Sequence, residues 1–131
     1  MDVDESQLPG YELRQLKKLD DRIAELKAIK RKELSDHQAT WDEFYTNHKE
    51  QVNEYTRLTK LKKEDKNFQP NIHENQVLQA IGGKRQEFEE TRDRLAEHLS
   101  NEIEAAKKDR QDKLAEYLER HKKPVKKTRA K

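Results

Sequence analysis

The chain has 131 residues, of which 43% are charged and 31% are hydrophobic, and its net charge is only +2. Charged residues usually make up about a quarter of a globular protein, so little apolar material remains for a compact core. High charge of both signs in near balance, with three Gly and three Pro, is typical of long exposed helices rather than of a disordered chain with one dominant sign.

The absence of cysteine excludes disulfides and thiol chemistry, and it fits a reducing compartment. The first ten residues are acidic and contain no apolar run, so we expect no signal peptide. Nowhere do ten apolar residues stand together, so we expect no membrane-spanning helix. An intracellular location, cytoplasmic or nuclear, follows as an expectation.

An acidic leader, residues 1–10, ends in Pro9 and Gly10 and is expected to be disordered. No Gly or Pro then occurs until Pro70, which predicts one long helix over residues 11–66. Apolar and aromatic residues recur along it in steps of three and four, as in a coiled coil. Ser35 and Gln38 have the spacing of a capping box, so a break near residue 35 is an alternative.

Residues 67–83 are expected to form a connector in which the chain reverses. Asn71 and Glu74 resemble a helix start, and a short helix over 74–81 would end at Gly82. A second long helix is predicted over 84–121, and a disordered basic tail over 122–131. The sequence therefore predicts an all-α fold, an elongated antiparallel helical hairpin or coiled coil, with a three-helix arrangement as the alternative.

The two predicted long helices differ in length, at about 84 Å and about 57 Å. If they fold back antiparallel, the second helix covers the first only to about residue 28. A leucine stripe would then remain uncovered, and we expect a second copy or a partner helix to bury it, together with the aromatic residues further along. The predicted partner-binding residues are Leu13, Leu16, Leu19, Ile23, Leu26, Trp41, Phe44 and Tyr55.

The last twelve residues contain seven basic side chains and no acid, which leaves 22 basic and 27 acidic residues in the rest. Such a tail is attracted to polyanions, such as nucleic acid or the acidic surface of another protein, or it only keeps the helices in solution. The predicted polyanion-binding residues are Lys122, Lys123, Lys126, Lys127, Arg129 and Lys131.

Partial catalytic and metal motifs fail when their spacing is examined. His73 and Glu74 begin a zinc-protease pattern, but Val77 stands where the second histidine is needed. Ser35, Asp36 and His37 are consecutive, and consecutive helical side chains point about 100° apart, so they form no relay. We therefore expect no enzymatic activity, no catalytic or metal-binding residues and no cofactor.

One stretch of the chain resembles a known family locally. Residues 73–120 are similar to the tubulin-binding helices of stathmin-type proteins. The similarity implies tubulin binding, and no site residue is carried over from it. It rests on His73-Glu74, Val77-Leu78-Gln79, Phe88, Glu104-Ala105, Lys107, Arg110 and Leu118-Glu119-Arg120.

Three hypotheses of function follow from the sequence. The leading one is a non-enzymatic coiled-coil structural or adaptor subunit that mediates protein–protein interaction within a larger assembly, as a homo- or hetero-oligomer. The second is a polyanion-binding protein whose tail engages nucleic acid while its helices dimerise. The third is tubulin binding.

Overall fold

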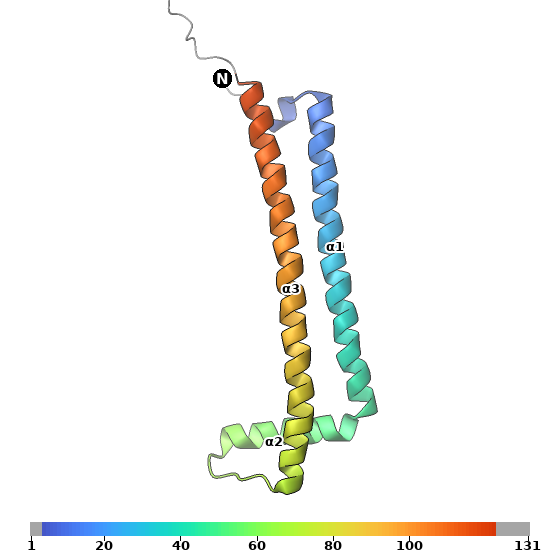
Figure 1. Cartoon of the computed structure of the whole chain (residues 1–131), viewed down its shortest axis with the longest axis vertical. Helices are drawn as coiled ribbons and strands as arrows, with labels where there is room; N and C mark the ends of the chain where they lie inside the picture. The colour runs from blue at the N-terminus through green and yellow to red at the C-terminus, as the bar shows by residue number, and fades with distance from the viewer. Residues whose placement is uncertain (1–3, 123–131) are drawn as a thin grey trace, which may run out of the picture. The chain divides into compact units, whose positions relative to one another are not determined.

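The computed structural model describes residues 4–122 and contains a short 3-10 helix, η1 (Glu5–Gln7), and three α-helices. These are α1 (Gly10–Asn47), α2 (Lys49–Glu64) and α3 (Ile72–Arg120), as Figure 1 shows. No strand occurs within residues 4–122, so the predicted all-α fold is confirmed. The predicted tail lies outside the described residues beyond Lys122.

The chain forms two compact units, to which α1 and α3 both contribute. Unit 1 combines the residues up to Lys30 with those from His98 onward, and unit 2 is Arg31–Glu97. In unit 1 the beginning of α1 packs antiparallel against the end of α3. Leu8, Leu16 and Tyr117 form its buried cluster, and Leu13, Leu114 and Leu118 pack around them.

The prediction of a disordered leader is wrong for residues 4–10. Asp4 and Gln7 form a reciprocal capping box around η1, and this turn places Leu8 in the core of unit 1. Arg110 on α3 donates to the carboxylates of Glu5, at 2.6 and 3.1 Å, and of Asp20, at 2.8 and 3.3 Å. These bonds raise the pKa of Arg110 above its ordinary value. The guanidinium therefore stays charged at any physiological pH and keeps its ion pairs with Glu5 and Asp20.

The long first helix predicted over 11–66 is divided at His48. The backbone of His48, with φ −133° and ψ 39°, is not helical, and no side chain caps the helix that follows. Its imidazole stacks on the ring of Phe44 with centroids 4.4 Å apart. The alternative of a break near residue 35 is also wrong, because α1 runs through Ser35 without interruption.

The start of α3 was predicted from Asn71 and Glu74, whose side chains and backbone form a reciprocal capping box with bonds of 2.8 and 2.9 Å. Its predicted end at Gly82 is wrong, because α3 continues through Gly82 and Gly83 to Arg120. Neither glycine has a positive φ, so both simply continue the helix. Gly82 has a packing role, since an added Cβ would lie 3.2 Å from Cε1 of Tyr55 on α2.

The two neighbouring glycines should respond differently to alanine. A Cβ on Gly83 would meet nothing within 4 Å, so Gly83→Ala should raise the free energy of unfolding by about 0.5–1 kcal/mol through helix propensity alone. Gly82→Ala should gain less, because the Tyr55 ring must shift to admit the methyl group. Urea unfolding at low protein concentration measures both, and equal gains would contradict close packing of α2 on Gly82.

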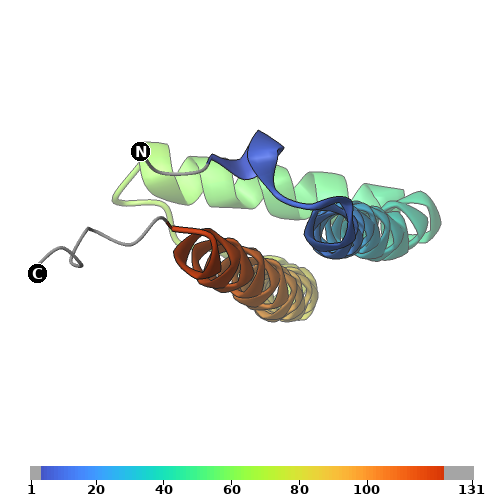
Figure 2. The same cartoon turned by 90° about the horizontal axis from the view of Figure 1, so that it is seen from above.

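Unit 2 contains the rest of α1, all of α2 and the first half of α3. α2 runs across α3 rather than along it, as Figures 1 and 2 show. Its Leu58 is fully buried, and Val52, Ile81 and Phe88 are also buried in this unit. At the edge, Arg57 bonds Glu54 and lowers the pKa of that carboxyl, and its guanidinium reaches Glu74 on α3 at 3.6 Å.

Candidate protein-docking site

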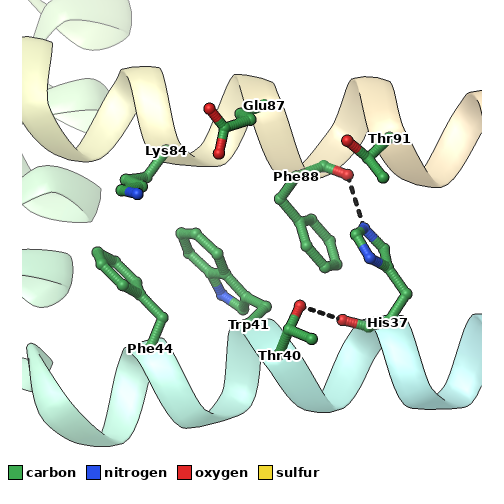
Figure 3. A pocket seen from close by; sticks show the side chains of 8 residues that line it. All are labelled: His37, Thr40, Trp41, Phe44, Lys84, Glu87, Phe88 and Thr91. Atoms are coloured by element: carbon green, nitrogen blue, oxygen red, sulfur yellow. Dashed lines mark hydrogen bonds between the residues drawn. The ribbon is translucent and has the colours of Figure 1, made fainter.

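A cavity of about 230 Å³ lies between α1 and α3 in unit 2, and we call it the aromatic groove. Each helix contributes four side chains, and Figure 3 shows the rings of Trp41, Phe88 and His37 between the two helices. The groove exists because the 3.6-residue period of each helix brings side chains three and four positions apart onto one face. The lining residues are His37, Thr40, Trp41 and Phe44 from α1, and Lys84, Glu87, Phe88 and Thr91 from α3.

Aromatic rings form the floor of the groove. His37 stacks on Phe88 with centroids 4.3 Å apart and planes 6° from parallel. Trp41 lies 5.3 Å from Phe44 and 5.6 Å from Phe88. Phe88 is only 7% exposed, whereas His37, Trp41 and Phe44 are half-buried. The cluster therefore has a buried base and an accessible edge.

Cations border this cluster on α3. The guanidinium of Arg85 lies 4.9 Å from the centroid of Trp41 and 5.2 Å from that of Phe88, and it also pairs with Glu89 at 2.8 Å. Lys84 and Glu87, by contrast, have no opposite charge within 4.0 Å among residues 4–122. Within the described part of the chain, a cation and an anion thus have no ion-pair partner beside an apolar surface.

The polar side chains on the α1 side of the groove are engaged with backbone. Nε2 of His37 donates to the carbonyl oxygen of Phe88 at 2.9 Å, and Oγ1 of Thr40 donates to the carbonyl of His37 at 2.6 Å, as drawn in Figure 3. The imidazole therefore cannot activate that hydroxyl as a general base would. These bonds fix the positions of both side chains at the groove.

The predicted leucine stripe lies in unit 1, and the premise that it is uncovered is wrong. Because the chain turns at His48 and α3 begins at Ile72, α3 extends far enough to cover this part of α1. Leu16 and Leu26 are buried, and Leu13, Leu19 and Ile23 are half-buried. The docking role of these five residues remains a prediction. The exposure on which that prediction was based is not observed.

Leu19 also lines a second cavity, of about 530 Å³, between α1 and α3 in unit 1. Its other lining residues include Tyr117 and three carboxylates, of which Asp112 and Glu116 pair with lysines of α3 itself at 3.0 and 3.5 Å. This cavity therefore offers fewer unpaired charges than its composition suggests.

A buried carboxylate joins the two ends of the described chain within unit 1. Glu12, only 3% exposed, accepts from Nη1 of Arg120 at 2.9 Å and pairs with Nε2 of His121 at 2.8 Å. Glu12 lies in the first turn of α1 and its partners at the last turn of α3. The helix dipoles favour these charges at both positions.

Glu12→Gln should lower the free energy of unfolding by about 1–2 kcal/mol, because a neutral amide replaces the buried acceptor of charge-assisted hydrogen bonds. Glu116→Gln is the matched control, since Glu116 contacts the same Arg120 at 3.1 Å but is half exposed. The control should change stability by less than about 0.5 kcal/mol. Urea unfolding compares the two variants. Equal losses of stability would argue against a buried interaction of Glu12 with Arg120 and His121.

Of the predicted docking residues, only Trp41 and Phe44 meet in the aromatic groove. Tyr55 lies on α2, where it packs on Gly82 instead. Of the predicted polyanion-binding residues, the structure describes Lys122 alone, and the rest lie outside the described residues. The sequence reasoning missed Lys84, Glu87 and Thr91, and it placed Phe88 on the second helix without its neighbours. The mostly charged residues on both sides of Phe88 gave no signal that could have found them.

No family model, curated protein sequence or solved structure matches the chain. Within residues 4–122, no helix is both long enough and apolar enough to cross a bilayer. In the same part of the chain, no three His, Asp or Glu side chains are grouped so that they could hold a metal ion.

Proposed function

We propose that this chain is a non-enzymatic structural or adaptor subunit that binds an amphipathic helix in the aromatic groove. One observation carries the proposal: Trp41 and Phe44 are half-buried at a cavity whose base, Phe88, is buried. Tryptophan and other large rings at the edge of a pocket are the usual anchors of protein interfaces. A helix that packs there would cover both rings.

The charges around the groove support a protein partner over a polyanion. Lys84 and Glu87 together carry no net charge, and Arg85 is already paired with Glu89. A surface of this kind selects its partner by opposite charges placed on both sides, whereas a nucleic-acid surface needs clustered, unopposed cations. The groove therefore favours a helix that presents small or apolar residues together with charges of both signs.

Because the chain contains no cysteine, a single thiol tests the proposal directly. Thr40→Cys, at the groove, carries a photoactivatable maleimide cross-linker, and Ser35→Cys is the matched control. Five residues along a helix correspond to a rotation of about 140°, so the control points away from the groove. In native extract, Thr40→Cys should give a defined adduct, and the cross-linked protein, once purified, should bind the unlabelled chain but not its Trp41→Ser variant.

Adducts from Ser35→Cys alone, or from neither position, would overturn the proposal. Binding of an oligonucleotide that weakens steeply with salt and is lost on removing residues 122–131, in the absence of groove adducts, would instead favour the polyanion function. Co-elution with tubulin heterodimers that tolerates Trp41→Ser would favour the tubulin hypothesis. Each of these results contradicts docking at the groove.

A further inference from the structure

We infer that the helix bound in the aromatic groove is α3 of a second copy of this chain, packed antiparallel to the first α3. The inference rests on the proposed function and names its partner. In this arrangement the interface is isologous, so that each α3 lies in the groove of the other copy and the same residues of both copies meet.

The unpaired charges make this face complementary to itself. Lys84 and Glu87 are three residues apart on one face of α3, and both line the groove (Figure 3). When two antiparallel helices are related by a two-fold axis that passes between residues 85 and 86, Lys84 of each copy faces Glu87 of the other. Two charges that have no partner within residues 4–122 thereby form two equivalent ion pairs.

Small residues on the same side of α3 leave room for this approach. Ala80 is exposed one turn before Lys84, and Gly83 has nothing within 4 Å of its would-be Cβ. A glycine inside a helix lowers the stability of the helix by about 1 kcal/mol relative to alanine. At Gly82 the close approach of Tyr55 explains why a glycine is present. No neighbour within the described chain accounts for Gly83, whereas close packing of a second helix requires a small residue there.

The apolar part of the groove fits the same arrangement. Trp41 and Phe44 are bulky and half-buried, and the face of α3 that would pack on them contains Ala80, Gly83 and Thr91. Large side chains opposite small ones allow two surfaces to interdigitate. The second copy would thus complete the burial of both rings in each groove.

Charge reversal tests the pairing. Lys84→Glu places a carboxylate opposite Glu87 of the second copy, and Glu87→Lys places an ammonium group opposite Lys84, so two repulsive pairs arise in each dimer by symmetry. Sedimentation equilibrium at low salt should show that each single variant dissociates at least about tenfold more readily than the wild type. The double variant, Lys84→Glu with Glu87→Lys, restores both pairs and should recover the wild-type dissociation constant.

Mixing the two single variants gives the sharpest result. A chain with Lys84→Glu and a chain with Glu87→Lys have opposite charges at both contacts, so the mixture should form heterodimers although neither variant dimerises well. Asp93→Lys changes the net charge by the same amount as Glu87→Lys but lies about 120° around the helix from Glu87. This control should dimerise like the wild type. Gly83→Ala should weaken the dimer severalfold while stabilising the single chain.

The outcomes separate the two proposals. A wild type that stays a single chain up to about 100 µM, a concentration far above the dissociation constants of most specific complexes, would overturn the inference. Single variants that dimerise as well as wild type, or a mixture that gives no heterodimer, would overturn it too. If Thr40→Cys adducts with another purified protein persist in that case, docking at the groove stands and only its occupant changes. Circular dichroism confirms that every variant compared is folded.

Discussion

Replacing Phe88 with alanine should lower the free energy of unfolding by about 3–4 kcal/mol, one of the largest losses expected for this chain. The ring is 7% exposed, stacks on His37 and contacts Trp41. Its removal leaves a cavity at the base of the aromatic groove, and Arg85 and Arg92 lose the ring face over which they lie. The lost packing and the lost cation–π contacts both destabilise the folded chain.

Trp41 is the only tryptophan in the chain, so its fluorescence during urea unfolding reports on this unit alone. Ile72→Ala is the control, because Ile72 is a large apolar residue of the same helix that is 79% exposed. The control should change stability by less than about 0.5 kcal/mol. A loss below about 1 kcal/mol for Phe88→Ala would show that the ring is not part of the core.

Replacing Leu16 with alanine should destabilise unit 1 by about 2–5 kcal/mol. Leu16 is 1% exposed and packs between Leu8 and Tyr117, which belong to different segments of the chain. Its loss should therefore loosen the N-terminal turn and the end of α3 together. The sequence analysis places Leu16 on an uncovered partner-binding stripe instead, in which case its replacement would weaken association and leave the fold intact.

Amide hydrogen exchange resolved along the chain distinguishes these two results, because only a core defect accelerates exchange in η1, α1 and the end of α3 at once. Leu19→Ala provides the comparison, since Leu19 is half-buried and should lose roughly half as much stability or less. Unchanged exchange protection with a reduced sedimenting mass would restore the interpretation of residues 13–26 as a docking stripe.

The helical character of the chain could be predicted because it depends on local signals. The near absence of Gly and Pro and the capping box of Asn71 and Glu74 both act through residues close together in the sequence. Each corresponds to an observed feature: the all-α fold and the start of α3 at Ile72. The end of α2 before Pro70 follows from equally local chemistry.

The turn at His48 could not be predicted, because no Gly, Pro or capping side chain marks it. The turn is compensated by tertiary packing, in which α2 crosses α3 and buries Val52 and Leu58. This one turn shifts the pairing of α1 with α3, so that Trp41 lies beside Phe88 rather than opposite residues some twenty positions further along. The periodicity of the sequence could therefore not predict the aromatic groove.

The ordered leader shows a second limit of sequence reasoning. Glu5 and Arg110 are 105 positions apart, and nothing in either local sequence indicates that they pair. Acidic residues near a chain end normally predict solvation. Here Glu5 pairs with a guanidinium from a distant helix, and only the three-dimensional arrangement shows which one.

The bond from Glu12 to Arg120 and His121 brings the first turn of α1 next to the last turn of α3. Neighbouring ends of this kind are what circular permutation needs. A short peptide could join them, and new ends could be opened in the exposed segment after α2, which lies in a different unit. The order in which the helices are synthesised is thus separable from the way they pack.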